Sequence, residues 1–475
     1  MVTLTRLVAR QLRAVLGKLP NKPTYISLQA GGEGLRVLGQ GQTVAVEYHE
    51  LGACSPCSLA VSISLLKEIE GSKPQPVTLT PTTDNRVTAT WLDGQVPCSL
   101  TVDTREPTDQ DPTFPTPPTT WLDNDPSLLR ALADATQTSD PSSSRYALGC
   151  LQLCGKTGVI AATDGRQLLK QSGFRFPFED EVLILGTKLF ACKELSHGDS
   201  VQVGRTADHV IFRTGRWTLY LAIQKAGRFP RIDDIIPRPE DALATVDLDP
   251  SDQEFLSANL RRLPIGTEQF QEVTLDLNGS VAIRAKRGDD SPTELVLSNS
   301  RKAGGDLAIC TDRRFLQRAA QLGFVRLHAF GLDRPVFCQD ERRQFVWMLL
   351  DKSGIVPRSP DATQVRSPVT TTAPTIHSTR TIKLPKPKRK ATVEQAHSPA
   401  TAPIHTAMQP TVSPRHSSQS ALDHSPLDQA IKLRASLREA LLATNDLVRA
   451  IKLQKKQDRA LRSTLASLRQ LQAVA

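Results

Sequence analysis

Apolar residues recur at helical spacing at three places in the first three quarters of the chain. The first run lies within residues 4–19, and two more open directly behind Asp125-Pro126 and Asp249-Pro250. An aspartate followed by proline is typical of a helix start, because the carboxylate caps free amides and proline fits the first turn. The pattern therefore predicts helices over 4–19, 127–135 and 251–263, at nearly equal intervals.

A second helix and a pair of strands are predicted to follow later in the repeating pattern. The second helices are expected over 58–69, 187–195 and 311–322. Behind the last two come segments in which apolar and polar residues alternate, as they do in strands with one buried face; these are 201–203, 209–212, 325–330 and 345–350. Three copies of a unit of about 115 residues, each with two helices and antiparallel strands, predict an α+β repeat.

Composition divides the chain into a globular part, a linker and a tail. Up to residue 353, apolar runs alternate with polar turns, and we expect three domains there, over 1–122, 123–240 and 241–353. Residues 354–425 are rich in Pro, Ser and Thr and poor in aromatic residues, which predicts a disordered basic linker. Residues 426–475 have no Gly, and no Pro after the first position, which predicts a helical tail.

The net charge of +10 comes from the C-terminal part of the chain. From residue 354 onward, 19 Lys and Arg stand against 7 Asp and Glu, whereas residues 1–353 have 40 against 42. A nearly neutral globular part does not bind nucleic acid over its whole surface, but it can carry a basic lining offset by an acidic exterior. Lys383–Lys390, reading KLPKPKRK, either contacts phosphates or is a solvated linker.

Cysteine and histidine spacing favours neither a metal site nor an enzyme. Among eight cysteines only Cys54 and Cys57 have ligand-like spacing, and no second pair is near, so ordinary thiols are favoured. There is no Gly-rich phosphate loop, paired-histidine motif or nucleophile elbow, and we expect no cofactor. No segment reaches the roughly 20 apolar residues of a membrane span, and no signal peptide is evident. We therefore expect a cytoplasmic, nucleoid-associated protein.

Three motifs carry a family resemblance. Thr163–Leu168 reads TDGRQL, Gly227–Pro237 reads GRFPRIDDIIP, and Phe345–Met348 reads FVWM. In this order and spacing, residues 1–353 resemble the beta subunit of bacterial DNA polymerase III, the sliding clamp. The chain departs from the family pattern at Asp233 and Asp234, where basic residues are common, and in continuing far beyond the last motif.

The resemblance implies the DNA-clamp, or processivity, fold: three repeated domains with antiparallel sheets outside and helices lining a ring, which a head-to-tail homodimer closes around double-stranded DNA. Such a clamp is non-catalytic and confers processivity on a replicative DNA polymerase. Phosphates would be contacted weakly, without base readout, by Lys and Arg on the helices. Each of these residues is equally explained as a solvated charge; they are Arg6, Arg10, Arg13, Lys18, Lys67, Arg130, Lys188, Lys193, Arg261, Arg262, Arg313, Arg314 and Arg318.

The resemblance also implies a hydrophobic pocket between the second and third domains, where DNA polymerase and clamp-loader subunits insert a short extended peptide. Met and aliphatic walls suit such a pocket because they adapt to related peptides. Each apolar member is equally explained as ordinary core. The expected residues are Leu148, Thr163, Gly165, Arg166, Leu168, Pro230, Ile235, Val346, Met348 and Leu350.

The tail adds a further possibility for assembly. From Leu433 to Leu468, apolar positions alternate four and three residues apart, with a polar break at Gln454 and Asp458. This is a heptad seam, which predicts a coiled coil with itself or a partner helix over 426–475 rather than a lone surface helix. The tail is also a candidate for tethering a partner at the pocket or competing for it.

The alternative function is a non-catalytic clamp-fold scaffold, or a specialised paralogue in DNA repair or replication, that assembles through the coiled coil. Salt resistance on circular DNA separates the two, because a closed ring is retained topologically whereas a surface binder is released by salt.

Overall fold

The computed structural model describes residues 1–82, 84–105, 113–143, 147–196, 198–265 and 270–369. The predicted tail over 426–475, its heptad seam, the basic patch over 383–390 and most of the predicted linker lie outside the described residues. Within the part that is described, no helix is both long enough and apolar enough to cross a membrane.

The first repeat combines two helices with two four-stranded sets of strands. Helix α1 spans Arg6–Leu16 and α2 spans Leu65–Ile69. The strands are β1 (Val2–Thr5), β2 (Tyr25–Gly31), β3 (Gly34–Gln40), β4 (Val44–Leu51), β5 (Cys57–Ser62), β6 (Pro76–Pro81), β7 (Arg86–Asp93) and β8 (Val96–Asp103).

The second repeat follows the same order of elements. Helix α3 spans Ser127–Thr138, and two 3-10 turns, η1 (Lys188–Ala191) and η2 (Lys193–Leu195), stand where the first repeat has α2. The strands are β9 (Trp121–Asn124), β10 (Cys150–Cys154), β11 (Val159–Thr163), β12 (Gln167–Gln171), β13 (Glu181–Leu185), β14 (Val201–Arg205), β15 (His209–Thr214) and β16 (Trp217–Ala222).

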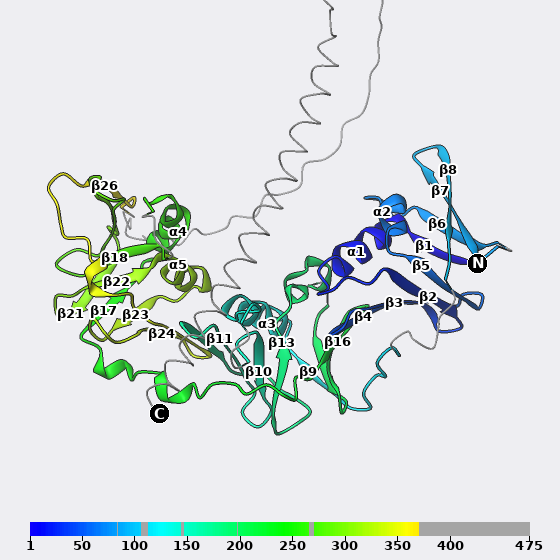
Figure 1. The fold of residues 1–475 in the computed structure, drawn as a ribbon, viewed down its shortest axis with the longest axis horizontal. Helices are drawn as coiled ribbons and strands as arrows, with labels where there is room; N and C mark the ends of the chain where they lie inside the picture. The colour runs from blue at the N-terminus through cyan, green and yellow to red at the C-terminus, as the bar shows by residue number, and fades with distance from the viewer. Residues whose placement is uncertain (83, 106–112, 144–146, 197, 266–269, 370–475) are drawn as a thin grey trace, which may run out of the picture. The chain divides into compact units, whose positions relative to one another are not determined.

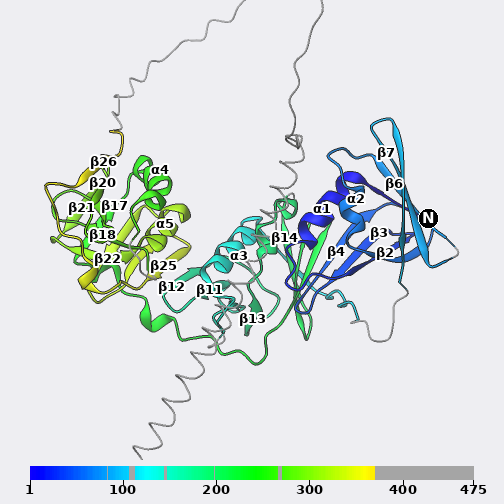
Figure 2. The ribbon, with the colours of Figure 1, turned by 45° about the horizontal axis from the view of Figure 1, so that its top comes forward.

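The third repeat adds two strands to this order. Helix α4 spans Pro250–Asn259 and continues into the 3-10 turn η5 (Leu260–Arg262), and α5 spans Arg313–Leu322. The strands are β17 (Ala244–Asp247), β18 (Glu272–Asp276), β19 (Ala282–Ala285), β20 (Thr293–Val296), β21 (Arg301–Gly304), β22 (Ala308–Asp312), β23 (Arg326–Ala329), β24 (Val336–Gln339), β25 (Arg343–Trp347) and β26 (Thr363–Arg366). In Figures 1 and 2, α4 and α5 lie side by side, as α1 and α2 do.

The sheets run across the junctions between repeats. Strand β4 of the first repeat pairs antiparallel with β16 of the second, from Val44 opposite Leu221 to Tyr48 opposite Trp217. Strand β12 pairs in the same way with β25 of the third repeat, from Gln167 opposite Trp347 to Gln171 opposite Arg343. The result is an eight-stranded sheet over the first junction and a nine-stranded sheet over the second.

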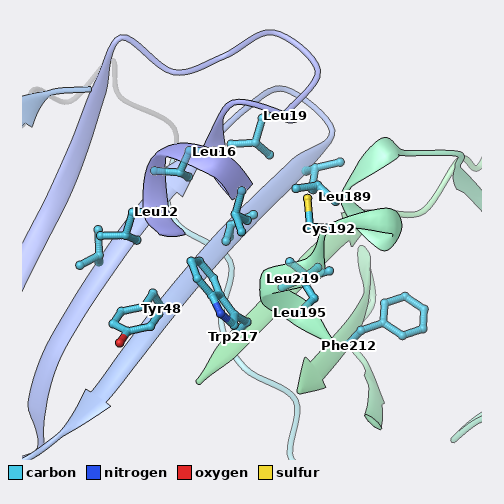
Figure 3. Close-up of a cluster of buried hydrophobic side chains, with 14 of the residues drawn as sticks. Leu12, Leu16, Leu19, Tyr48, Leu189, Cys192, Leu195, Phe212, Trp217 and Leu219 are labelled. Carbon is cyan, nitrogen blue, oxygen red and sulfur yellow. The ribbon is translucent and has the colours of Figure 1, made fainter. Parts of the chain in front are cut away.

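Apolar packing reinforces the first junction. Leu12 and Leu16 of α1 and Leu195 of η2 belong to one cluster of buried side chains with Trp217 of β16, as Figure 3 shows. The Trp217 ring packs edge-on against Tyr48 of β4 at 4.9 Å between centroids. Each fully buried side chain of this size contributes about 1.5–3 kcal/mol to stability. Because side chains of both repeats belong to this cluster, the first two repeats share one core.

Two predicted helices differ from the structure. Residues 58–62 belong to β5, which pairs antiparallel with β2, and the helix covers only Leu65–Ile69. Leu59 and Val61 alternate with small or polar neighbours, which is the spacing of a strand and not of a helix. The segment over 187–195 forms η1 and η2, because Cys192 between them has an extended backbone with ψ of 128°.

The predicted linker begins later than expected. Residues 354–369 are folded against the third repeat, and β26 pairs in parallel with β20. Pro and Ser gave this segment a linker-like composition, but its backbone amides and carbonyls are bonded to the third repeat, so no apolar run is needed to hold it.

A buried ion cluster lies where this segment crosses the third repeat. Arg284 of β19 is 2% exposed and pairs with Asp276 of β18 and with Glu294 of β20, the latter at 3.5 Å between Nε and Oε2. Its Nη1 also donates to the carbonyl of Val356 at 2.7 Å. Burial lowers the pKa of Arg284, although Glu294 opposes the shift. The guanidinium is therefore the counter-charge of two buried carboxylates.

We expect Arg284→Met to lower the free energy of unfolding by about 3–5 kcal/mol, because Glu294 would remain buried without a counter-charge and Asp276 would keep only Arg358, at 3.6 Å. Arg287→Met, at an exposed position beyond the same strand, should change it by no more than about 0.5 kcal/mol. Urea unfolding followed by tryptophan fluorescence measures both. Equal stabilities of the two variants would contradict the role of the cluster.

Candidate functional site

The basic residues predicted to contact DNA fall into exposed and internally bonded groups. Five are exposed and, among the described residues, have no ion-pair partner; they are Arg10, Lys18, Lys188, Lys193 and Arg262. They come from all three repeats and lie on helices, on 3-10 turns or directly after one. These five residues, the exposed basic set, are the predicted DNA contacts that are free to bind an anion.

Three lysines of the exposed basic set gather at the first junction. Lys18 follows α1, which contacts η2, and its charge acts on Cys192. Burial is the main reason that the pKa of Cys192 is raised to about 11, and Lys18 opposes that rise. Lys188 and Lys193 flank Cys192 in η1 and η2 and are exposed. The junction therefore presents positive charge from two repeats.

Arg6 and Arg13 of α1, two of the predicted DNA contacts, are bonded within the first repeat. The Arg6 side chain is 11% exposed and pairs with Asp93 at 2.7 Å, and its Nη2 donates to the carbonyl of Glu70 at 3.1 Å. Arg13 pairs with the Glu70 carboxylate. Of the three arginines, Arg10 alone keeps a free guanidinium within the described residues.

Arg313 is a structural residue and not a surface contact. It is 1% exposed, and its Nη1 donates to the carbonyls of Leu260 and Leu263 at 3.0 and 2.7 Å. Its Nε donates to Gln271 at 2.9 Å. Burial lowers its pKa. Arg313 thus holds the turn after α4, and its predicted contact with DNA is wrong.

Arg318 joins the second and third repeats. Its Nη2 lies 3.0 Å from Asp134 of α3, and its Nη1 donates to Gln137 at 2.9 Å. Both charged side chains are mostly buried, at 13% and 14% exposure. This ion pair is an internal link, so Arg318 is not available as predicted.

The remaining predicted basic residues are exposed but have neighbours. Arg130 lies 3.9 Å from Asp134, and Lys67 lies 3.8 Å from Glu68. Arg261 donates to Gln317 at 3.1 Å. Arg314 pairs with Asp312, which holds its pKa above the usual value. The exposed pairs of Arg130 and Lys67 are weak, so these two side chains can exchange partners at little cost. Arg314 is held more firmly, because the Asp312 carboxylate is fully buried.

Four of the predicted peptide-binding residues, Arg166, Leu168, Val346 and Met348, meet at the β12–β25 seam. Leu168 lies opposite Val346, and the amide of Met348 donates to the carbonyl of Arg166 at 2.8 Å. Two motifs that are far apart in the sequence are therefore hydrogen-bonded neighbours.

A tight turn sets the edge of the seam. Gly165 has φ of +87°, a conformation that favours glycine. The Asp164 carboxylate accepts from the amides of Arg166 and Gln167 at 2.8 and 2.9 Å. Thr163 accepts from the Gly165 amide at 3.0 Å and donates to the Gln167 carbonyl at 2.7 Å. Thr163 and Asp164 therefore shape the turn.

Apolar side chains at the seam divide into a buried floor and an exposed rim. Leu168 and Val346 are 1% and 3% exposed and form the floor with side chains that the sequence analysis missed, namely Ala161, Ile232, Phe330 and Phe337. Ile235 and Met348 are 50% and 47% exposed. Leu148, Pro230 and Leu350 are partly exposed. A partner can touch the rim directly, whereas the floor only supports it.

Two charged side chains near the seam are already engaged. Lys170 of β12 pairs with Asp233 at 2.8 Å, so this departure from the family pattern is neutralised within the chain. The guanidinium of Arg166 lies 4.2 Å from the centre of the Phe270 ring, which positions an exposed cation at the turn.

Metal and thiol chemistry is not organised in the described part of the chain. No three His, Cys, Asp or Glu side chains come together there as metal ligands would. Cys54 and Cys57 are free thiols, and Cys54 donates only to the carbonyl of Gly52.

Comparison with known proteins establishes the fold. No family model and no curated protein sequence matches the chain. The structure is similar to the DNA polymerase III subunit beta of Pseudomonas aeruginosa, with a TM-score of 0.62 and 19% identity over 74% of this chain and 99% of that one. The sliding clamp of Bacillus subtilis gives 0.62 and 16%, over 74% and 98%. The predicted α+β clamp fold is confirmed.

We expect Arg313→Met to lower the free energy of unfolding by about 2–3 kcal/mol, because two buried carbonyls would lose their donors. Arg262→Met removes an exposed arginine that has no ion-pair partner among the described residues, and it should change this free energy by no more than about 0.5 kcal/mol. Chemical denaturation compares the two variants. An equal or larger loss for Arg262→Met would contradict the assignment of Arg313 as the structural residue.

Proposed function

We propose that this chain, which has the fold of the bacterial sliding clamps, is a DNA sliding clamp that confers processivity on a replicative DNA polymerase. In this proposal a head-to-tail homodimer encircles double-stranded DNA, and the three repeats act as domains over 1–122, 123–240 and 241–353. The similarity to clamp subunits over 98–99% of their length carries the proposal.

DNA is held topologically and touched only weakly. The globular part is nearly neutral, and its exposed basic set supplies a few mobile cations that attract phosphates without fixing a register. Lys67, Arg130 and Arg261 can add to it when their weak contacts open. The protein performs no chemistry itself in this proposal. It acts in the cytoplasm, in association with the nucleoid.

Partner proteins bind at the seam between the second and third repeats. The floor of Leu168 and Val346 is rigid, and Ile235 and Met348 are the apolar contacts that an extended peptide can cover. Clamp-loader and polymerase subunits are the partners that we infer for this surface.

A second candidate function is a clamp-fold scaffold, or a specialised paralogue in DNA repair or replication, that assembles through residues 426–475. One observation favours it: strand β26 occupies an edge of the third repeat.

Retention on DNA separates the two functions. The full chain, loaded by its matching clamp loader, should remain on nicked circular DNA at raised salt and be lost from the same DNA after linearisation. Salt-sensitive release from both forms would exclude a closed ring and favour the scaffold.

We expect the double charge reversal Arg10→Glu with Lys18→Glu to weaken salt-dependent DNA binding and to reduce the slope of log K against log salt by about 1 to 2. Lys286→Glu with Arg287→Glu, two exposed positions outside the helices, is the charge-matched control. Fluorescence anisotropy with a duplex at several salt concentrations measures both. Equal slopes for the two variants would remove these residues from the DNA surface.

We expect Ile235→Lys and Met348→Lys each to weaken peptide-type ligands by about tenfold or more, because both place a charge on the apolar rim. Griselimycin, which is bound to a clamp of Pseudomonas aeruginosa, is the probe, and calorimetry is the measurement. Leu92→Lys alters an exposed leucine of β7 outside the rim and should leave the affinity unchanged. Equal affinities in all three variants would place the binding surface elsewhere.

A further inference from the structure

The three repeats use equivalent strands for the same purpose. In each repeat the second, third and fourth strands form a ladder that ends in an edge strand: β4, β12 and β20. The edges of β4 and β12 are covered by β16 and β25 of the following repeat, each over five antiparallel residue pairs. By the same rule, β20 is the edge that would accept the first repeat of another copy.

The chain covers the β20 edge with its own C-terminal extension, residues 350–368. Strand β26 pairs with β20 in parallel, with Thr363 opposite Thr293 and Arg366 opposite Val296. Figure 2 shows the two strands side by side. The covering strand therefore differs in direction from those at the other two junctions, and it comes from the segment that follows residue 353.

The extension is fastened along its whole path across the third repeat. The amide of Leu350 donates to Cys310 of β22 at 2.9 Å, and the amide of Val356 donates to Thr274 of β18 at 2.7 Å. The carbonyl of Val356 accepts from Arg284 of β19 at 2.7 Å. The segment thus crosses β22, β18 and β19 in turn before it reaches β20.

A second anchor lies directly after β26. Ser367 is 2% exposed, and its amide donates to the carbonyl of Val296 at 2.9 Å. Its hydroxyl accepts from the amide of Ser298 at 2.8 Å, and its carbonyl accepts from the Ser298 hydroxyl at 2.9 Å. The strand is therefore held at both ends and is not a loose tail.

The complementary edge is open at the other end of the chain. Strand β8 corresponds to β16 and β25, and within the described residues only β7 pairs with it. The amide of Thr104 donates to Asn85 beside β7 at 2.8 Å, so by alternation the amides of Ser99 and Thr101 point away from β7. Pro97 occupies an outward position, as proline does on edge strands.

We infer that residues 363–366 are a built-in cap on the edge that β8 of a second copy would use, and that head-to-tail assembly requires this cap to leave β20. The inference rests on the head-to-tail dimer of the proposed function.

The cap is suited to reversible release. All four side chains of β26 are exposed, so little apolar area holds it. Parallel pairing is slightly weaker per residue than the antiparallel pairing that β8 would offer. The cap has the advantage of being in the same chain, where effective concentrations reach the millimolar range. A loader or partner that grips residues 350–368 would shift this balance toward assembly.

Paired proline substitutions in the full chain test the cap. Thr363→Pro with Val365→Pro removes amides that face β20: the Thr363 amide donates to the carbonyl of Pro292 at 2.9 Å, and that of Val365 faces the same way by alternation. Gln364→Pro with Arg366→Pro is the matched control, because the amides at these positions face away from β20 and their loss is tolerated at an edge.

Hydrogen exchange of residues 96–103, together with sedimentation velocity, provides the readout. The predicted coiled coil of the tail would also associate, so the protection of β8 against exchange is the decisive quantity. We expect Thr363→Pro with Val365→Pro to slow exchange in β8 at least tenfold in a concentration-dependent manner, and the control to match the parent chain. Adding Ser99→Pro with Thr101→Pro should abolish that protection and the associated dimer.

Two outcomes would overturn the cap. One is an equal hydrogen-exchange rate of β8 in the two double-proline variants. The other is a parent chain in which β8 and β26 are both protected from exchange at the same time. The second outcome, combined with retention on circular DNA, would leave the clamp function intact. Conversely, protection of β8 in the uncapped variant without salt-resistant retention would uphold the cap and reject the clamp function.

Discussion

Pairing between strand edges is the interaction on which the rest of this structure depends. Each repeat ends one ladder in an unsatisfied edge, and the following repeat supplies the strand that satisfies its amides and carbonyls. The pairings β4–β16 and β12–β25 thereby merge neighbouring repeats into common sheets. Three repeats form two such junctions. Two edges are therefore left without a partner from another repeat, namely β20 of the third repeat and β8 of the first. How the chain manages these two edges decides how it assembles.

The candidate binding surface follows from the same pairing. Register at the second junction sets Leu168 against Val346 and brings the turn at Gly165 beside Met348. A slip of one residue would turn each of these side chains to the other face of the sheet. The floor and the Met348 side of the apolar rim are therefore products of the junction.

Sequence patterns predicted what depends on local chemistry. The Asp-Pro boundaries located α3 and α4, and Asp164-Gly165 located the turn at the seam. They could not show which arginines are buried, because Arg313 and Arg314 are adjacent and differ only in the tertiary groups around them. Strand β26 escaped notice for a related reason: TQVR has all its side chains exposed and is recruited by the edge of β20 rather than by a hydrophobic face.

The position of β26 in the chain determines when it can pair with β20 during synthesis. Synthesis runs from the N-terminus, so β20 exists before residues 363–366 have been made. At about 5–20 residues per second, the interval is roughly 3–13 seconds. During it the nascent third repeat has an open edge, and on a polysome a neighbouring nascent chain can reach it. Each molecule thus has one brief period, before its own C-terminal extension emerges, in which pairing with a sister chain meets no competitor.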